Sequence, residues 1–364
     1  MNSVLNEYLI SAKSKISNAG PVVLVIGNEA ADLDSMASAV TYAYFLEKTE
    51  KYKNVIPLIN IPSADFKLRT EAVFLFEEAG IDSGNLISIE DTDINKIYSE
   101  GNLKLILTDH NSPGKALAGY KDAVVEIIDH HADEKNYPAE TVCDIRPVGS
   151  ACTIVAENFL SKAPSLIDKS IGTLLLGTIL LDTVNLDPKA ERVKPEDEKA
   201  AEELIKITGI DKDKLFEKIQ FEKFNVSSLG TYDLLRKDYK EWDLGKVKCG
   251  IASVLMSASD WLEKDPDIVS SFEKFRSEKN LDILFAMNAF TEPEFTRNLF
   301  IYTPDQILRK KVVDFLEGSD LGLEKIDTSG ISSPEKINVY NQKNLGISRK
   351  KLQPLLKDFF ENNL

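Results

Sequence analysis

The stretch PVVLVIGNEAADLDSMASA, residues 21–39, places Asp32 and Asp34 shortly after a continuous apolar run. An apolar run without alternation predicts a strand that is covered on both faces, as in a parallel sheet between helices. Residues 35–48 then have the pattern of a helix. One aspartate can cap this helix, but capping does not explain both, because the two side chains should project differently. We therefore expect the pair to bind a cation at the end of the strand.

Comparable apolar runs recur in the first half of the chain. Residues 54–61, 103–109 and 123–129 each carry a short run that predicts a strand, and a helical stretch separates the first two. Nearly continuous runs of this kind are typical of a doubly wound, mainly parallel sheet with helices on both faces. The sequence therefore predicts an α/β fold for this half.

The domain organisation follows from length and from a shift in composition. A chain of 364 residues exceeds what one hydrophobic core usually organises, so we expect two domains. Residues 1–205 form the predicted first domain. Residues 188–223 are highly charged with a helical period, which predicts a solvated helical face, and residues 206–224 form the predicted linker. Residues 225–364 carry longer apolar runs with helical segments between them, which predicts a second, smaller mixed α/β domain.

Charge and cysteine content argue against several classes of protein. The 44 basic and 59 acidic side chains give a net charge of -15, which should repel nucleic acid and anionic membranes. Three cysteines without a CxxC spacing argue against a structural zinc site and favour a reducing compartment. The N-terminal residues lack the apolar core of a signal peptide, and no apolar run approaches the roughly 20 residues of a membrane span. We therefore expect a cytoplasmic protein without nucleic-acid or membrane partners.

Polar residues with ligand chemistry follow four of the apolar runs. They are Asn28, Asp32 and Asp34 after the first, Asp109, His110 and Asn111 after the second, Asp129, His130 and His131 after the third, and Asp182 after the fourth. Ligands of a doubly wound sheet gather beyond the carboxyl ends of its strands, so neighbouring parallel strands would bring these groups into one crevice. The chain has only three histidines, and all three lie in these groups. Random placement would rarely produce this pattern.

A convergence of carboxylates needs positive charge. Unpaired carboxylates repel one another and their pKa values rise, and divalent cations remove this repulsion. Carboxylates with a few imidazoles suit Mn²⁺, Mg²⁺ or Co²⁺ better than a metal that prefers thiolates. Two such ions about 3.5–4 Å apart can activate a water molecule and neutralise a transferring phosphoryl group. The sequence therefore predicts metal-assisted hydrolysis of a phosphoanhydride or phosphoester.

The same motifs resemble those of a known family. In chain order they are NEAADLDS (28–35), LTDHN (107–111), IIDHHAD (127–133), GTILLDT (177–183) and the tail GISRKKLQPLL (346–356). The first four resemble the motifs of the DHH phosphoesterase family. The tail resembles the associated C-terminal domain of family II inorganic pyrophosphatases and eukaryotic exopolyphosphatases. Family II pyrophosphatases begin the first motif with a histidine, whereas this chain is similar to fungal cytosolic exopolyphosphatases in having Asn28.

The resemblance implies an exopolyphosphatase, which hydrolyses the terminal phosphoanhydride of linear polyphosphate and releases orthophosphate without a covalent enzyme intermediate. Two alternatives stay open: a family II-type inorganic pyrophosphatase, and a weakly active regulatory scaffold with the same fold. The intact metal-binding motifs disfavour the scaffold. The family also suggests a monomer.

The resemblance further implies roles for individual residues. The metal ligands would be Asp32 at a first ion, Asp34, His130 and Asp182 at a second, and Asp109 between the two. His131 would face the phosphate and stabilise charge or protonate the leaving oxygen, and Asn28 would be a weak ligand or a substrate contact. His110, Asn111 and Asp129 would orient these groups.

Cations near the tail are the expected substrate-binding groups. By resemblance, Ser348, Arg349, Lys350 and Lys240 would bind the polyphosphate chain, and domain closure would bring them to the metals. A further candidate is the pair Gly149 and Ser150, whose backbone N–H groups could contact phosphate or simply cap a helix.

Overall fold

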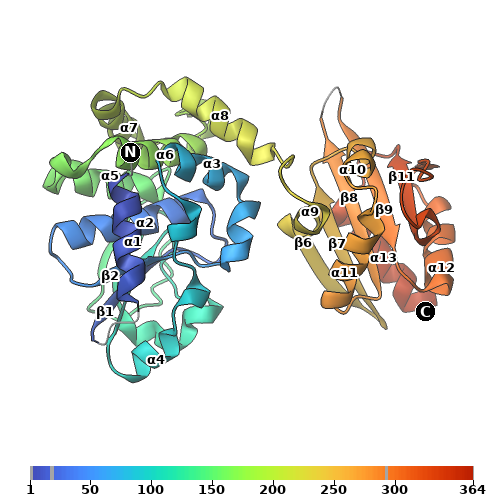
Figure 1. The fold of residues 1–364 in the computed structure, drawn as a ribbon, viewed down its shortest axis with the longest axis horizontal. Helices are drawn as coiled ribbons and strands as arrows, with labels where there is room; N and C mark the ends of the chain where they lie inside the picture. Colours follow the sequence, from blue (N-terminus) through green and yellow to red (C-terminus); the bar gives the residue numbers. More distant parts are fainter. Residues whose placement is uncertain (1–2, 17–19, 292–293, 364) are drawn as a thin grey trace. The chain divides into compact units, whose positions relative to one another are not determined.

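The computed structural model describes residues 3–16, 20–291 and 294–363. The chain forms two compact units, Met1–Phe224 and Asn225–Leu364 (Figure 1). Each unit has its own sheet and its own hydrophobic core, and both mix helices with strands. The predicted fold class is confirmed.

The first unit contains a parallel five-stranded sheet with the order β2-β1-β3-β4-β5. Its strands are β1 (Val22–Ile26), β2 (Val55–Leu58), β3 (Leu103–Thr108), β4 (Val124–Asp129) and β5 (Val142–Ile145). The predicted apolar runs form β1 to β4, and all residues of β1 and β2 are buried. Because β1 pairs with both β2 and β3, the strand order reverses beside β1, and a crevice opens at the carboxyl ends there.

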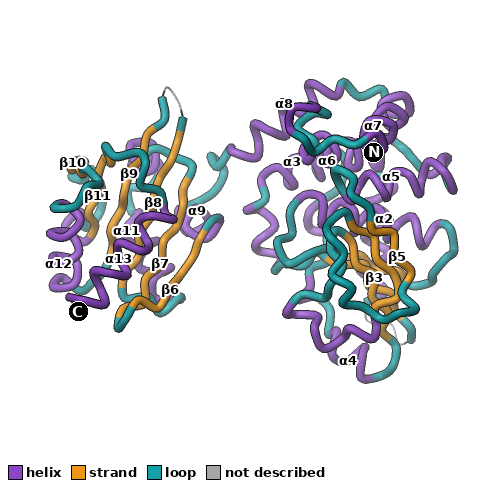
Figure 2. Tube along the Cα trace, turned by 180° about the vertical axis from the view of Figure 1, so that it is seen from behind, coloured by secondary structure: helices purple, strands orange, loops and turns teal. Residues whose placement is uncertain are grey.

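Helices pack around this sheet in Figure 2, where strands are orange and helices purple. They are α1 (Val4–Lys15), α2 (Leu33–Lys48), α3 (Thr70–Glu78), α4 (Ile94–Ser99), α5 (Ala151–Lys162), α6 (Lys169–Asp182), α7 (Pro195–Thr208) and α8 (Lys212–Phe224). Helix α6 is buried on nearly every side, since it packs against α2, α5, α7 and α8. Among the described helices, none has both the length and the apolar character that crossing a membrane requires.

Residues 206–224 differ from the predicted linker. They form the end of α7 and the whole of α8, and α8 packs against α3 and α6 of the first unit. Leu215 and Ile219 are buried in its core, and Gly177 of α6 lets Ile219 approach, because a Cβ there would lie 3.0 Å from its Cδ1. The many charges of this stretch therefore lie on the solvent-exposed side of these helices.

The second unit contains a mixed six-stranded sheet with the order β10-β11-β9-β8-β7-β6, in which only β7 and β8 are parallel. The strands are β6 (Tyr239–Leu244), β7 (Val247–Val254), β8 (Ile283–Phe290), β9 (Thr296–Tyr302), β10 (Leu323–Lys325) and β11 (Ile337–Gln342). The helices are α9 (Thr231–Lys237), α10 (Ala258–Lys264), α11 (Ile268–Glu278), α12 (Gln306–Glu317) and α13 (Arg349–Asn363). Alternate residues of β9 face opposite sides, since Leu299 and Ile301 share a core with α12 and α13, whereas Phe300 contacts Trp261 of α10.

Candidate active site

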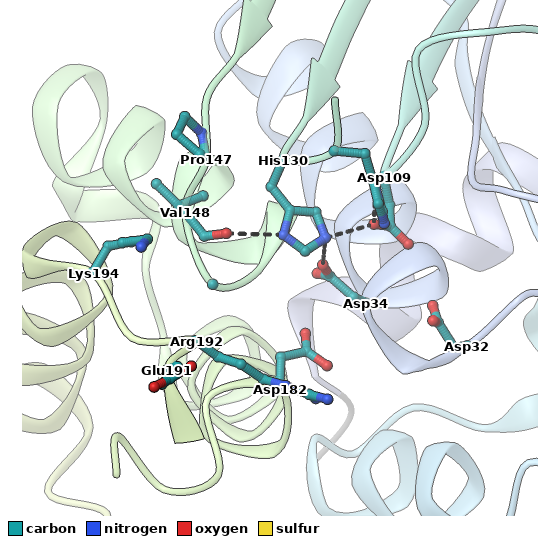
Figure 3. Close-up of a pocket in the computed structure, with 12 residues that line it drawn as sticks. Asp32, Asp34, Asp109, His130, Pro147, Val148, Asp182, Glu191, Arg192 and Lys194 are labelled. Carbon is teal, nitrogen blue, oxygen red and sulfur yellow. Dashed lines mark hydrogen bonds and ion pairs between the residues drawn. The ribbon is translucent and has the colours of Figure 1, made fainter. Parts of the chain in front are cut away.

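A cleft of about 370 Å³ lies at the carboxyl ends of β1, β3 and β4 in the first unit (Figure 3). Its lining residues are Asp32, Asp34, Asp109, His130, His131, Pro147, Val148, Gly149, Asp182, Glu191, Arg192 and Lys194. All five predicted metal ligands and His131 are among them. The cleft sits where the strand order reverses, as expected for a ligand site in a doubly wound sheet.

The first motif is shaped by a close approach between β1 and α2. A Cβ at Gly27 would lie 2.5 Å from the carbonyl oxygen of Ser35, so only glycine lets the two elements come this near. Asp32 is the N-cap of α2, and its Oδ1 accepts a hydrogen bond of 3.1 Å from the N–H of Ser35. Its side chain is exposed at the cleft, where it can also contact an ion.

Asp34 is buried and lies against the beginning of α5. Its Oδ1 accepts hydrogen bonds from Ser150 Oγ at 2.8 Å and from the N–H of Cys152 at 2.9 Å, and its Oδ2 accepts one from the N–H of Ala151 at 2.6 Å. The N-terminus of α5 thus binds a carboxylate from α2. Of the two roles considered for Gly149 and Ser150, the structure shows Ser150 at the N-cap position.

Asp109 is the centre of the cluster. Its φ of 60° is uncommon for a residue other than glycine, and its N–H bonds to the carbonyl of Ile128 at 2.9 Å. Its Oδ1 lies 3.1 Å from His130 Nε2, while the second histidine nitrogen, Nδ1, lies 3.0 Å from the carbonyl of Val148. His130 Nε2 is also 3.7 Å from Asp34 Oδ2. Asp109 thus combines an uncommon backbone conformation with a side-chain contact to His130, which follows the neighbouring strand β4.

Asn28 contacts this cluster through its nitrogen. Nδ2 donates to Asp109 Oδ2 at 2.7 Å, whereas Oδ1 accepts from the N–H groups of Ala30 and Ala31 at 2.9 and 3.0 Å. The amide oxygen is therefore used by the turn after β1. In this arrangement Asn28 holds Asp109 and is not among the residues that line the cleft.

His131 is held by a buried acid. Its Nδ1 lies 2.8 Å from Asp129 Oδ1, and Asn111 donates a second hydrogen bond to Asp129. This contact with Asp129 raises the pKa of His131. Burial opposes ionisation of Asp129, but the hydrogen bonds from His131 and Asn111 keep its pKa below the ordinary value. The side chain of His131 is 57% exposed, so its Nε2 can reach a ligand in the cleft.

His110 lies apart from the cleft lining. Its Nδ1 is 2.8 Å from the carbonyl of Thr108, and its buried Nε2 has no hydrogen-bond partner among the described residues. Burial lowers the pKa of His110. The expected orienting contacts are thus present for Asn111 and Asp129, whereas His110 bonds to the backbone.

Asp182 enters the cleft from the last turn of α6, so the fourth apolar run is a helix. Its Oδ2 is buried and has no hydrogen-bond partner within the described ranges. Burial and then the charge of Asp34 raise the pKa of Asp182 well above its ordinary value. An acid placed in this way gains a partner when a cation binds beside it.

The electrostatics of the cluster fit a divalent metal. Burial, and then the charge of Asp34, raise the pKa of Asp109 to about 10, and burial likewise raises the pKa of Asp34. Asp109, His130 and His131 offer ligand atoms that lie within 4.8 Å of one another. Carboxylate oxygens and imidazole nitrogens are the donors that Mn²⁺ and similar ions prefer. The donor set and the unpartnered Asp182 oxygen therefore suit bound divalent ions.

Several residues in and behind the cleft are not predicted from the sequence. Arg192 and Lys194 line it, and the buried Asp197 supports them by accepting hydrogen bonds from the N–H groups of Lys194 at 2.7 Å and Gly149 at 2.9 Å. Asp197 also accepts one from Thr153 Oγ1 at 2.6 Å. The only signal was the sequence RVKPED inside the stretch read as a solvated charged face.

The predicted substrate-binding cations lie in the second unit. Arg349 begins α13, and its Nη2 forms an ion pair of 2.7 Å with Asp238 Oδ1. Its Nη1 also donates to the carbonyl of Ile251 at 3.5 Å, and Lys240 pairs with Ile251 in the sheet. The structure thus brings Lys240 and Arg349 to one part of this unit. Ser348 accepts the first N–H bonds of α13, and Lys350 is exposed.

Two family models match the chain. Residues 22–179 match the N-terminal domain of the DHH family, and residues 217–359 match the DHHA2 domain. The first match includes most of the cleft, and the second includes the sheet of the second unit and most of α13.

Curated proteins resemble the chain over nearly its whole length. Exopolyphosphatase PRUNE1 of Mus musculus is 34% identical over 359 residues, which cover 97% of this chain and 79% of that protein. A Schizosaccharomyces pombe protein named "Putative exopolyphosphatase" is 31% identical over 374 residues, which cover 97% of this chain and 94% of that protein. The manganese-dependent inorganic pyrophosphatase of Methanothrix thermoacetophila is 28% identical over 284 residues, with coverages of 77% and 85%.

Proposed function

The chain belongs to the DHH family, and from this premise we propose that it is a metal-dependent exopolyphosphatase, which releases orthophosphate from the end of linear polyphosphate. The observation that carries the proposal is the convergence of buried acids and two histidines in one cleft, with the pKa of Asp109 raised to about 10. Two relatives with exopolyphosphatase names at 34% and 31% identity support this substrate.

Divalent ions such as Mg²⁺, Mn²⁺ or Co²⁺ would be held by Asp32, Asp34, Asp109, His130 and Asp182. When bound, they would supply positive charge for the phosphoryl oxygens and lower the pKa of water. The name of the manganese-dependent relative supports manganese as one of these metals. We propose two ions, because the acids reach the cleft from both the strand ends and α6.

His131 would supply the proton for the leaving oxygen. It is exposed to the cleft, and its contact with Asp129 raises its pKa and so favours the protonated ring. Asn111 and Asp129 would fix the orientation of that ring. Asn28 would act by holding Asp109 with its amide nitrogen.

The phosphate chain would be bound by Lys240, Ser348, Arg349 and Lys350. Arg349 offers a planar guanidinium, which suits phosphate oxygens. Its present partner, Asp238, is 55% exposed, so substrate can compete for this ion pair. The three cysteines are free, which supports a reducing compartment such as the cytoplasm, and a monomer stays our prediction.

The direct test is phosphate release from long-chain polyphosphate and from pyrophosphate, each with Mg²⁺, Mn²⁺ and Co²⁺. We expect faster release from polyphosphate with every active metal, since two relatives named exopolyphosphatase are 34% and 31% identical to the chain. Faster release from pyrophosphate would instead assign the chain to the manganese-dependent pyrophosphatases. Release from neither substrate would support the scaffold role.

A further inference from the structure

The wall of the cleft between α6 and α7 carries two cations. Arg192 and Lys194 both line the cleft, whereas Val193 between them does not, and the acidic Glu191 before them also lines it. Side chains at i and i+2 of an extended segment project to the same side, which suits the placement of the two cations. Figure 3 shows both residues with Asp182 and Val148 around the same space. The segment therefore presents a short row of positive charge to the carboxylate cluster.

The row is held in place by buried contacts. The N–H of Lys194 donates to Asp197 Oδ2 at 2.7 Å, and the same carboxylate accepts the N–H of Gly149 at the start of α5. A Cβ at Gly149 would lie 2.9 Å from the carbonyl oxygen of Arg192, so the segment packs too closely against this glycine to leave room for a side chain. These contacts fix the backbone of the two cations relative to the metal-binding groups.

The charged groups of the Arg192 and Lys194 side chains make no contact that stabilises the fold among the described residues. Arg192 and Lys194 are exposed, and within residues 3–16, 20–291 and 294–363 neither forms a side-chain hydrogen bond or ion pair. Among the acids that line the same cleft, Asp34 bonds to α5 and Asp109 bonds to Asn28 and His130, whereas Asp182 Oδ2 has no hydrogen-bond partner within the described ranges. In a chain of net charge -15, two unpaired cations at this place are available to an anionic ligand.

We propose that Arg192 and Lys194 form a subsite for the phosphates that follow the terminal one in a linear polyphosphate, and that they favour long chains over short ones. This inference rests on the proposed function. The terminal phosphate would bind at the metal site, and the following phosphates would lie along the segment that carries Arg192 and Lys194. A planar guanidinium and an ammonium bind successive phosphate oxygens with charge-assisted hydrogen bonds. A long chain offers these two cations more phosphate oxygens than a ligand of two phosphates does.

The test compares two double variants that each remove two positive charges. Arg192→Ala/Lys194→Ala removes the row, and Lys199→Ala/Lys218→Ala removes exposed lysines of α7 and α8 outside the cleft. Phosphate release is measured with tripolyphosphate and with chains of tens of phosphates. For long chains we expect the KM of the first variant to rise about ten-fold with kcat nearly unchanged, and a smaller rise with tripolyphosphate. The control should match the wild type.

Two further readouts separate binding from a structural role. The salt dependence of kcat/KM on long chains should become shallower by about 1.5 in a log–log plot, because two phosphate contacts are lost. The swapped variant Arg192→Lys/Lys194→Arg should restore the KM to within about three-fold, since it keeps both charges. A fall in kcat and melting temperature without these effects would overturn the inference.

The outcomes also separate this inference from the proposed function. If the wild type releases no phosphate from polyphosphate, the proposed function fails. If the wild type is active and the Arg192→Ala/Lys194→Ala variant behaves as the Lys199→Ala/Lys218→Ala control, only the subsite fails. An equal rise in KM for short and long chains would also contradict it, because the row would then bind the terminal phosphate.

Discussion

Two buried acids of the first unit, Glu126 and Asp109, differ in whether a cationic side chain of the protein neutralises them. Glu126 of β4 is 3% exposed, and both its oxygens lie 2.8 Å from Lys51 Nζ, while Tyr42 donates a further hydrogen bond. Asp109 is 2% exposed, yet no lysine or arginine pairs with it among the described residues, and its pKa is raised to about 10. Equally buried acids can therefore have different roles. Glu126 is neutralised by Lys51 of the same chain, whereas Asp109 requires a bound cation for its charge to be neutralised.

The strongest test of this contrast is Asp109→Asn. Removing the central carboxylate should lower phosphate release by about a thousand-fold, because the proposed metal-binding groups lose the member that contacts His130. The melting temperature of the metal-free protein should stay the same or rise, since one acid with a raised pKa is gone. Phosphate release and thermal melting with and without Mn²⁺ measure the two effects.

Wild-type protein should gain several degrees of melting temperature when Mn²⁺ is added, and the Asp109→Asn variant should gain much less. Binding of the ion to the folded state alone produces this shift. Equal shifts in both proteins would mean that Asp109 is not part of the metal site, and the contrast with Glu126 would break.

Lys51→Met tests the other side of the contrast. It leaves Glu126 buried without its cation and should lower the free energy of unfolding by about 1–2 kcal/mol, a discounted value because the Lys51 side chain is 43% exposed. The kcat should stay within about two-fold, since Glu126 does not line the cleft. Urea unfolding and phosphate release measure both quantities.

Lys53→Met is the matched control, because Lys53 is exposed, lies two residues away and has no ion pair within the described part of the chain. It should leave the unfolding free energy nearly unchanged. A large loss of activity in Lys51→Met at normal stability would show that Glu126 serves the site after all.

How far the sequence predicts this site depends on where each residue lies. Asp32, Asp109 and His130 follow strands at the edge where β1, β3 and β4 end, so apolar runs and the rule for doubly wound sheets were sufficient to group them. Asp182 also follows an apolar run, but that run is the helix α6, so the rule for strand ends does not by itself explain its place in the cleft. The parallel sheet itself followed from the same runs.

The remaining features depend on contacts between distant segments. Ser150 meets Asp34 across 116 positions, and Asp197 meets Gly149 across 48, and no local pattern encodes such pairs. The charged stretch that contains Arg192 was assigned to a solvated face because composition does not reveal which charges face a cleft. The predicted linker differed for a related reason, since Leu215, Phe216 and Ile219 of α8 pack against residues that are distant in the sequence.

Ser150→Ala is the smallest and most specific test of how the acidic cleft is built. Ser150 Oγ donates to Asp34 Oδ1, and two backbone N–H groups would still hold that carboxylate after the change. We therefore expect a stability loss of about 1 kcal/mol and a roughly ten-fold higher Mn²⁺ concentration for half-maximal activity, with kcat at saturating Mn²⁺ nearly unchanged. Urea unfolding and a Mn²⁺ titration of phosphate release measure these changes.

Ser38→Ala is the matched control, because Ser38 is also a buried serine of the first unit but bonds only to the carbonyl of Ser35. If both variants need the same Mn²⁺ concentration, the hydrogen bond from Ser150 to Asp34 contributes to stability and not to metal binding. If Ser150→Ala alone needs more, the N-terminus of α5 sets the position of Asp34 for metal binding. Hydrogen bonds would then orient Asp34 at the cleft without neutralising its charge. Glu126 differs, because its ion pair with Lys51 does neutralise it.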